Sequence, residues 1–317
     1  QRQMCIRDRA QTYGRPGMNK KIVNSYLMTN GDRFTDQPGY KTMQYYDEMQ
    51  NRDPRLTQTV VGPGYMRINS DKVESPNFSS STTGYQIIKW VTDASGDGYL
   101  GSSNDYILFR AAEVYLNYAE AKAELGTLTQ EDLKISIKKI RDRVGMPALD
   151  MTAANNNPDP LMASYYPNVN SGANKGVILE IRRERTVELP CEGLRQWDML
   201  RWKEGAQLVP SSNGLDGFLG CYFPSLGEYD MNGDGKMDLC LWSGTKPATT
   251  CDAMLEIGEG KDAQLTDGTS GYIVCFRGRT YKWEEGRDYL WPIPTDQRVA
   301  TGGALSQNPG YEDGLSF

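Results

Sequence analysis

The chain of 317 residues contains no histidine. Without an imidazole it cannot build a Ser-His-Asp or Cys-His catalytic group, and it lacks the ligand that zinc sites use most often. No stretch approaches the roughly 18 consecutive apolar residues that a membrane-spanning helix needs. These absences exclude several common enzyme classes and predict no membrane-spanning helix.

Positive charge is also scarce. Lys and Arg number 35 against 41 Asp and Glu, which gives a net charge of −6 and a pI near 5.0. A nucleic-acid partner requires a basic face for its phosphates, so the charge balance argues against one. Basic residues gather at 138–143 and 182–185, but acidic residues interleave with them. We interpret both clusters as helix faces that form ion pairs.

The six cysteines contain no Cys-x-x-Cys pair, which argues against a metal or thioredoxin-type site. They are Cys5, Cys191, Cys221, Cys240, Cys251 and Cys275. Cys221, Cys240 and Cys251 lie close enough in sequence to bridge within one loop, and free buried thiols fit the pattern at least as well.

The first residues, QRQMCIRDRA, lack periodicity and resemble translated sequencing-adapter sequence. We therefore predict that residues 1–9 are a non-native leader and that residues 10–317 form the domain. Residues 11–105 are predicted to be irregular with short extended pieces, because Asp-Pro and Pro-Gly pairs favour turns. Within them, residues 84–91 are rich in β-branched and aromatic side chains and predict a strand.

Two helical hairpins are predicted, at residues 106–146 and 177–204. The first carries an apolar set at helical spacing, and a second set on the same helix predicts burial on two sides. That second set is Val114, Tyr118, Ala121 and Leu125. Thr129 is the predicted N-cap of the next helix. The first hairpin has about the size of one tetratricopeptide-like repeat.

Three other segments lack helical periodicity. Residues 150–176 predict a polar loop, and residues 206–288 predict a longer insertion rich in Gly and Asp. Residues 289–317 are predicted to be extended, because prolines remove backbone donors and fix φ. The sequence thus predicts a mostly α fold of tetratricopeptide-like helical hairpins, with long irregular loops and a few short strands.

The segment VELPCEGLRQWDMLRW, at residues 187–202, combines five charges with two tryptophans. Its charges are spaced to pair within and between helices, while the indoles can fill a seam. We interpret the segment as a corner where helices pack rather than as an active site. Four aromatic residues at helical spacing are predicted to lie in the core: Trp197, Trp202, Tyr115 and Tyr118.

Four segments together resemble the C-terminal hallmarks of the SusD/RagB family, the nutrient-binding outer-membrane lipoproteins of Bacteroidetes. They are YILFRAAEVYLNYAEAKAEL, IKKIRDRVGMP, RRERTVELPCEGLRQWDMLRWK and YLWPIPTDQRVATGGALSQNPGY. The resemblance implies a mostly α, tetratricopeptide-like fold. It also implies non-catalytic capture of oligosaccharides, or sometimes peptides, at the cell surface. The implied partner is a SusC-like TonB-dependent transporter of the outer membrane.

The sequence departs from the family pattern in two ways. The resemblance covers the C-terminal part, so we expect the family's N-terminal half, with its lipidated cysteine and earlier helical repeats, to be missing here. VATGGAL also stands where the family has an Asn/Pro-rich stretch. Anchoring and much of the ligand site therefore cannot be carried over from the resemblance.

A possible calcium loop lies in DMNGDGKMD. Its alternating oxygens, a glycine in sixth place and a carbonyl in seventh match an EF-hand-like loop. The ligand positions are Asp230, Asn232, Asp234, Lys236 and Asp238. Leu241 occupies the place of the bidentate glutamate, so a simple glycine-rich turn is the competing interpretation. We predict a structural calcium ion that clips the long insertion.

Sugar binding needs flat aromatic faces surrounded by polar groups. Aromatic residues in loops suit this better than those at helical spacing, although local packing is the alternative for each. The candidates are Trp242, Tyr222, Tyr65, Tyr99 and Trp90. Trp242 is preferred because it follows the predicted calcium loop. Trp291 belongs to a family motif and is interpreted as structural.

Two other functions compete. A glycoside hydrolase needs only two suitably spaced carboxylates, but no Asp or Glu appears in an apolar setting that would raise its pKa. A helical-repeat adaptor that binds only proteins should lack long aromatic insertions, which this chain has. The residues by themselves predict helical hairpins with long aromatic loops, and the resemblance implies that the chain is a non-catalytic binder of oligosaccharides or other nutrients.

Overall fold

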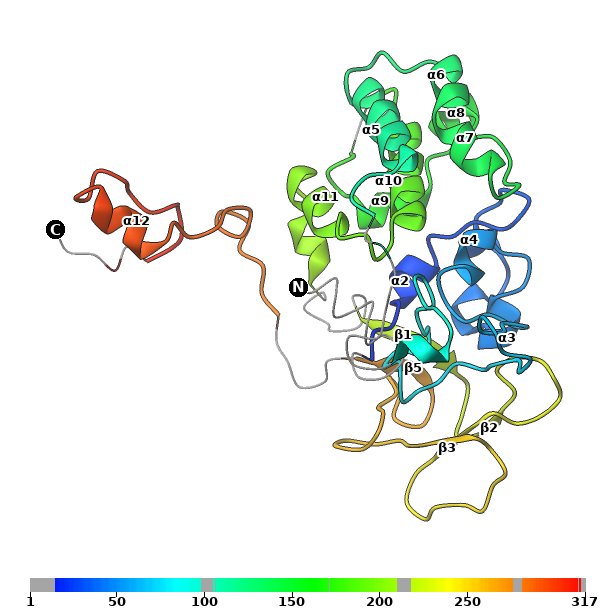
Figure 1. Ribbon diagram of the computed structural model, residues 1–317. Coiled ribbons are helices and arrows are strands. Elements are labelled where there is room, and N and C mark those ends of the chain that lie inside the picture. The colour runs from blue at the N-terminus through cyan, green and yellow to red at the C-terminus, as the bar shows by residue number, and fades with distance from the viewer. Residues whose placement is uncertain are drawn as a thin grey trace.

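The computed structural model describes residues 15–97, 105, 107–170, 172–209, 218–275, 281–312 and 314. Figure 1 shows the longer helices gathered at one end of the body and two small sheets at the other, with short helices between them. The mostly α fold with few short strands is as predicted. The predicted leader, residues 1–9, lies outside the described residues and stays a prediction.

Short helices interrupt irregular chain between residues 15 and 97. They are α2 (Lys20–Val23), α3 (Tyr45–Glu48) and α4 (Pro54–Thr57), with 3-10 turns η1 (Phe34–Asp36), η2 (Tyr40–Thr42) and η3 (Ala94–Asp97). Asp53 caps α4 by accepting from the Arg55 amide, and Pro54 supplies the φ of the first helical position.

The predicted strand at residues 84–91 is wrong. Only two isolated bridges form there, between Gln86 and Gly17 and between Ile87 and Val60. Gly84 and Trp90 have φ values of 81° and 73°, so the chain turns at both ends of the segment. Too few extended residues remain between these turns to build a ladder.

The first predicted hairpin forms, but its second helix is broken. α5 (Ala111–Glu124) is followed by α6 (Gln130–Ile135) and α7 (Ile137–Asp142). Thr129 caps α6 as predicted, in a reciprocal capping box with Asp132. The break lies at Ser136, whose hydroxyl donates to the Asp132 carbonyl at 2.5 Å. Such back-bonding competes with the helical ladder.

The predicted polar loop at residues 150–176 is also wrong, because it contains two helices. α8 (Met151–Asn156) is capped by Asp150, and α9 (Pro160–Tyr165) is capped by Asp159. Each helix has six residues, which is too short for a 3.6-residue period to show in the sequence. Asp150 and Asp159 as N-caps, and Pro160 at the first helical position, were the features of the sequence that could have indicated these helices.

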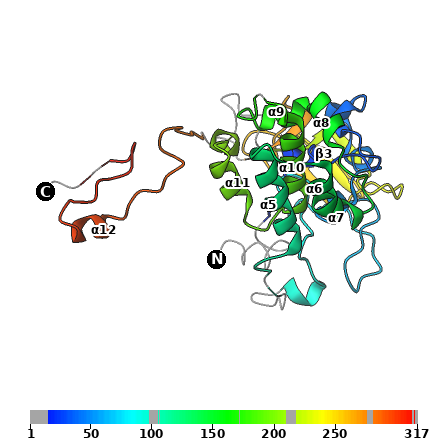
Figure 2. The same cartoon turned by 90° about the horizontal axis from the view of Figure 1, so that it is seen from above.

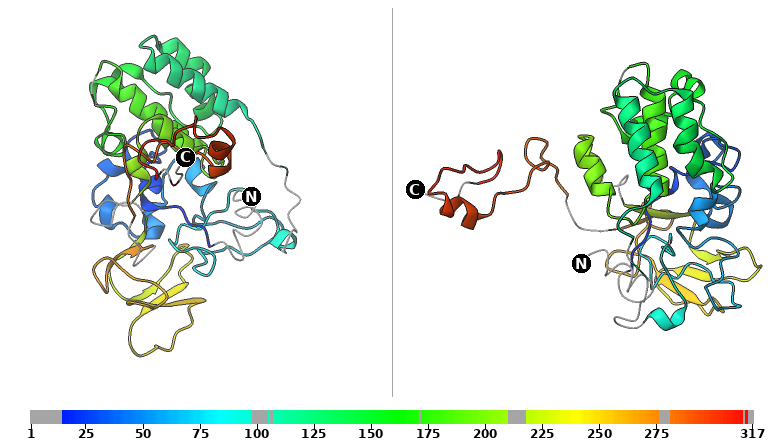
Figure 3. Two further views of the ribbon diagram at one scale, coloured as in Figure 1. Left: turned by 90° about the vertical axis from the view of Figure 1, so that its left-hand side faces the viewer. Right: turned by 45° about the horizontal axis from the view of Figure 1, so that its top comes forward.

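The second predicted hairpin is α10 (Lys175–Glu188) and α11 (Arg195–Arg201), joined by a turn with positive φ at Cys191 and Gly193. α10 is the central helix. Twelve of its fourteen residues are buried, and it contacts α4, α5, α8 and α9. The views in Figures 1 and 3 show α10 enclosed by these neighbours. The two hairpins therefore form one helical layer around α10.

Buried ion pairs hold α10 to its neighbours. Glu184 is completely buried and pairs with Arg55 of α4 at 2.9 Å and with Arg141 of α7 at 2.6 Å. Glu188, also buried, pairs with Arg55 at 3.2 Å and with Arg110, which precedes α5, at 2.6 Å. Carboxylates of one helix thus join segments that are far apart in the sequence.

The segment at residues 187–202 is a packing corner, as predicted. Glu192 pairs with Lys89 at 2.5 Å and with Arg110 at 2.7 Å. Trp202 is buried, with 7% of its surface exposed, and its indole donates to Glu120 of α5 at 2.6 Å. Trp197 is 60% exposed, so its predicted place in the core is wrong.

The second apolar set of α5 is exposed. Val114 is 63% exposed, Tyr118 is 39% exposed and Leu125 is 75% exposed. The prediction that α5 is buried on two sides is therefore wrong. Leu116 and Ala119 do lie in the core, and Tyr115 packs partly against it. Periodicity identified which faces of α5 are apolar but not which face a neighbour covers.

The predicted insertion at residues 206–288 is not simply irregular, because its described residues form five strands. β1 (Leu219–Phe223) pairs antiparallel with β5 (Gly271–Val274). In a second sheet, β3 (Leu239–Trp242) pairs antiparallel with β2 (Gly227–Tyr229) and parallel with β4 (Ala253–Glu256). The 3-10 turn η4 (Gly205–Leu208) precedes both sheets.

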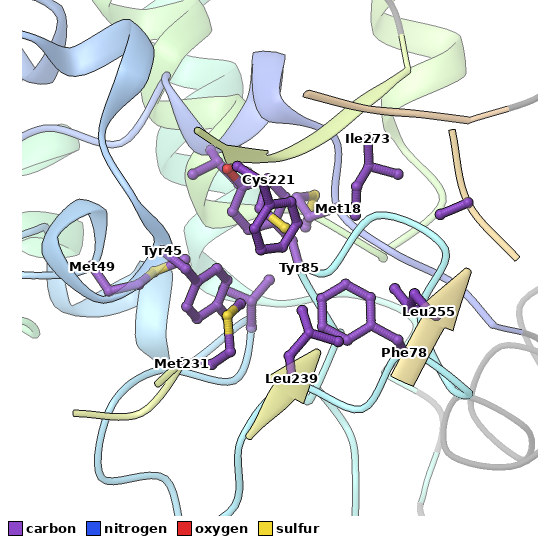
Figure 4. Close-up of a cluster of buried hydrophobic side chains, with 14 of the residues drawn as sticks. Met18, Tyr45, Met49, Phe78, Tyr85, Cys221, Met231, Leu239, Leu255 and Ile273 are labelled. Carbon is purple, nitrogen blue, oxygen red and sulfur yellow. The ribbon is translucent and has the colours of Figure 1, made fainter. Parts of the chain in front are cut away.

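These strands and the N-terminal segments share one core. Its members come from both, including Tyr45, Phe78 and Tyr85 on one side and Cys221, Leu239 and Ile273 on the other. Figure 4 shows these side chains facing one another. The insertion therefore forms half of a core rather than a loop on the surface.

The C-terminal segment extends past α11, away from the body, and carries the short helix α12 (Thr295–Ala300), as Figures 1 and 2 show. Trp291 is 65% exposed within it. Where the segment leaves the body, the Gly205 amide donates to the Tyr289 hydroxyl at 3.1 Å. None of the described helices is long and apolar enough to cross a membrane.

Candidate ligand-binding pocket

A pocket of about 150 Å³ lies where three segments meet. The first is the start of α3, the second is the end of β1, and the third runs from β2 into the predicted calcium loop. The lining residues are Gln44, Tyr45, Tyr46, Asp47, Tyr222, Phe223, Tyr229, Asp230 and Met231. Aromatic rings, two carboxylates and one amide therefore surround one hollow.

The floor of the pocket is rigid because it belongs to the core. Tyr45, Phe223 and Met231 are each at most 2% exposed, and Figure 4 shows Tyr45 beside Met231. The Tyr45 hydroxyl donates to the Val61 carbonyl, and its ring stacks on Tyr85 with centroids 5.8 Å apart. Burial raises the pKa of Tyr45 well above its usual value, so the hydroxyl keeps its proton.

The rim of the pocket carries polar side chains. Tyr46 is 38% exposed, and Gln44 and Asp47 are exposed beside it. Tyr222 is half-buried, and its ring makes an edge contact with Tyr272 at 5.4 Å. Within the described part of the chain, no hydrogen bond or ion pair engages the side-chain polar atoms of Gln44, Tyr46, Asp47 or Tyr222. These groups remain available to a ligand.

The predicted calcium loop forms the opposite wall. The two carboxylate oxygens of Asp230 accept from the Gly233 amide at 2.6 Å and from the Gly235 amide at 2.8 Å. Gly233 has a φ of 82°, and a Cβ there would lie 2.0 Å from the Tyr46 ring. A glycine is therefore required both by the turn and by the close approach of the loop to α3.

The remaining predicted ligands follow the same turn. Asn232 accepts from the Asp234 amide at 2.9 Å, Asp234 accepts from the Lys236 amide at 2.8 Å, and Asp238 accepts from the Met231 amide at 2.8 Å. Burial raises the pKa of Asp238, and the charges of Asp230 and Asp234 raise it further. The three carboxylates therefore repel one another.

The donor set of the loop suits calcium in type, because Ca²⁺ takes carboxylate, amide and backbone oxygens. In the described ranges, no group of three or more His, Cys, Asp or Glu side chains is placed to hold a metal ion. A calcium site here would also need the Asn232 amide and the Lys236 carbonyl. The side-chain oxygens are engaged as turn acceptors but keep further lone pairs.

The other aromatic candidates lie elsewhere. Trp242 ends β3, half-buried, in register with Glu256 of β4. Tyr65 is half-buried, and burial followed by the charge of Glu74 raises its pKa. Trp90 has a positive φ, and the centroid of its ring lies 5.5 Å from the Lys89 ammonium. None of these three lines the pocket.

Tyr99, the remaining candidate, lies outside the described residues. Of the five aromatic candidates, the structure places only Tyr222 at the pocket, together with Asp230 of the predicted calcium loop. Gln44, Tyr46, Asp47 and Tyr229 also line the pocket, but the sequence did not predict them. Two tandem tyrosines followed by an acid at residue 47 were a weak signal. Gln44, Tyr46 and Asp47 lie more than 170 residues before Tyr222, where the other part of the pocket begins, so periodicity could not reveal the site.

Comparison with known proteins decides the family. The model of the SusD family matches residues 2–311. The chain belongs to the SusD family. The resemblance seen in the four sequence motifs is thereby confirmed. Comparison with curated protein sequences gives no match.

Solved structures show the same fold. A SusD-like protein from Bacteroides fragilis has 22% identity and a TM-score of 0.53, over 93% of this chain and 47% of its own. A SusD-like carbohydrate binding protein from the same species has 21% identity and a TM-score of 0.53, over 89% of this chain and 46% of its own. This SusD-family chain therefore spans about half the length of these proteins.

Proposed function

We propose that this chain takes part in binding an oligosaccharide at the cell surface, without altering it, for delivery to a SusC-like TonB-dependent transporter of the outer membrane. Membership of the SusD family supports the proposal. One of its structural neighbours is described as a carbohydrate binding protein. Because the chain spans about half of these neighbours, transporter and location are part of the proposal.

The pocket is the observation that carries the proposal. Tyr46 and Tyr222 offer aromatic faces at the rim, and Gln44 and Asp47 offer polar atoms beside them. A pyranose presents apolar C–H faces and a ring of hydroxyls, which this arrangement complements. Typical ligand pockets enclose about 300–1,000 Å³, so this smaller hollow suits one sugar residue of a longer chain.

The pocket favours binding over glycoside hydrolysis. A hydrolase needs one carboxyl that keeps a proton to donate. Both oxygens of Asp230 accept hydrogen bonds from backbone amides of its own loop, which hold the carboxyl in the turn. Asp47 is exposed to water at the rim rather than held in an apolar setting.

Tyr222→Ala is expected to weaken oligosaccharide binding by about 30-fold, which corresponds to the roughly 2 kcal/mol that an aromatic contact at the centre of a site can contribute. Isothermal titration against a panel of heptasaccharides measures this. Trp291→Ala, which removes an exposed aromatic ring on the C-terminal segment, should change nothing. Loss on Trp242→Ala but not on Tyr222→Ala would place the site elsewhere. Shortened sugars seen by chromatography would contradict binding without turnover.

We also propose that the loop from Asp230 to Asp238 binds calcium as a structural clip. Relief of the repulsion among its three carboxylates would supply part of the binding free energy. Without a bidentate glutamate we expect a dissociation constant of roughly 0.1–1 mM, as in extracellular calcium modules. Calorimetric titration of calcium into wild type and Asp234→Ala measures it, with Asp296→Ala as control. Identical heats for wild type and Asp234→Ala would end the proposal.

A further inference from the structure

The charged residues that line the pocket are all acidic. Its lining residues include Asp47 and Asp230 but neither Lys nor Arg. The loop that forms one wall adds Asp234 and Asp238 against the single cation Lys236, which is exposed and does not line the hollow. The calcium ion proposed for this loop would offset the charges of Asp230, Asp234 and Asp238, whereas Asp47 lies outside the loop. Asp47 is therefore the acidic group that a ligand meets whether or not the loop holds calcium.

Two lysines among the described residues lie near the pocket, Lys20 and Lys41, and neither forms an ion pair with Asp47. Lys20 lies behind the floor, buried, with its ammonium 2.5 Å from Glu48. Glu48 also accepts from the Tyr85 hydroxyl at 2.7 Å, so this buried group is satisfied within the core. Lys41 is exposed, and its ammonium lies 5.9 Å from the Tyr40 ring. None of these residues lines the pocket.

The two carboxylates that line the pocket differ in the hydrogen bonds that they already accept. Asp230 is held by two amides of its own loop, which fix its position. Asp47 makes no hydrogen bond or ion pair through its side chain with the described residues. Tyr46 directly precedes Asp47 and Gln44 lies three residues before it, and neither side chain makes a hydrogen bond with the described residues. This corner can accept several hydrogen bonds from one cationic group.

Resting on the proposed function, we infer that the pocket selects a sugar residue that carries a protonated amine over a neutral or an acidic sugar. The ammonium binds Asp47, and the ring lies against Tyr222 and Tyr46. An ammonium has three donors and no acceptor, which matches a rim of carboxylate, amide and hydroxyl oxygens. A uronic acid would instead place its carboxylate beside Asp47, where like charges repel.

The test compares four pentasaccharides by isothermal titration at pH 6 and low salt. They are a β-1,4-linked glucosamine pentamer, its N-acetylated form, cellopentaose and a pentameric uronic acid. Because hydrogen bonds between charged groups are the stronger class, we expect the amine to bind about tenfold more tightly than either neutral pentamer. The uronic acid should bind most weakly. High salt should reduce the preference.

Asp47→Asn should abolish the preference for the amine, so that the glucosamine pentamer and cellopentaose bind this variant with equal affinity. Asp296→Asn removes the same charge from α12 and should keep the preference, which separates the pocket from the net charge of the chain. Equal affinity of wild type for the amine and cellopentaose would overturn the inference and leave the proposed function standing. A preference that survives Asp47→Asn would also overturn it. Failure of all four pentamers to bind would contradict both.

Discussion

Glu184→Gln is expected to lower the free energy of unfolding by about 3–5 kcal/mol, the usual effect of breaking a buried ion pair. Glutamine keeps the size of the side chain but removes its charge. Arg55 and Arg141, which are 3% and 4% exposed in their side chains, would then remain buried against a neutral group. Denaturant unfolding followed by circular dichroism measures the loss.

Glu131→Gln is the matched control. Glu131 pairs with Lys134 on the surface of α6, and the two side chains are 70% and 56% exposed. Surface pairs at this spacing contribute about 0.3–0.5 kcal/mol, so the control should be nearly neutral. Equal effects of the two substitutions would show that the ion pairs of α10 are not a main link between the helices.

The stability of the protein in acid provides a second test of the role of Glu184. Burial raises the pKa of Glu184, but Arg141 and Arg55 outweigh burial, and the pKa is lowered to about 2. A carboxyl with a lowered pKa stabilises the folded state above its unfolded value of about 4.3, and that contribution is lost as the pH falls through the folded value. Wild type should therefore lose stability between about pH 4.5 and pH 2, and Glu184→Gln should lose less over that range.

Gly176→Ala is expected to destabilise the protein by about 3 kcal/mol, although alanine is the better helix former by about 1 kcal/mol. A Cβ at Gly176 would lie 1.9 Å from the Ala154 carbonyl oxygen and 2.8 Å from the Asn155 Cα. Both are backbone atoms of α8. Asn155 also accepts from the Val177 amide at 2.8 Å, which holds α8 against the start of α10.

Thermal unfolding of Gly176→Ala and Gly286→Ala side by side tests this packing. A Cβ at Gly286 meets nothing within 4 Å, and its φ is not positive. Alanine there should be neutral or slightly stabilising, because it reduces the freedom of the unfolded chain. A Gly176→Ala protein as stable as wild type would mean that α8 does not need its close approach to α10.

A structural feature could be predicted where one short stretch of sequence contains all the residues that produce it. Thr129 and Asp132 are three residues apart and form their capping box without outside help. The turn around Gly193 needs only a residue that tolerates positive φ. By contrast, Ser136 breaks a helix that has continuous apolar periodicity, and α8 and α9 are too short to display a period.

The residues of the pocket also divide into those that the sequence could indicate and those that it could not. Tyr222 and Asp230 could be proposed from composition and motif, because loop aromatics and alternating acids are visible in the sequence. Tyr46 and Asp47 could not, because they line the pocket only where the fold brings the start of α3 against the loop, with Tyr46 close to Gly233. Trp242 was preferred for its closeness to that loop in sequence, yet the strand carries it to another place.

The sequence by itself determined the helical hairpins, the charged corner between α10 and α11, and the family. The hairpins and the corner follow from the spacing of residues within short stretches, because steric and hydrogen-bonding effects act between near neighbours. The family follows from motifs that are also short stretches of sequence. Only the tertiary structure decided that Val114 and Trp197 face outward, that residues 219–274 build a core with the N-terminal segments, and where the pocket lies. These outcomes depend on which distant segment covers each apolar face, and periodicity contains no information about that partner.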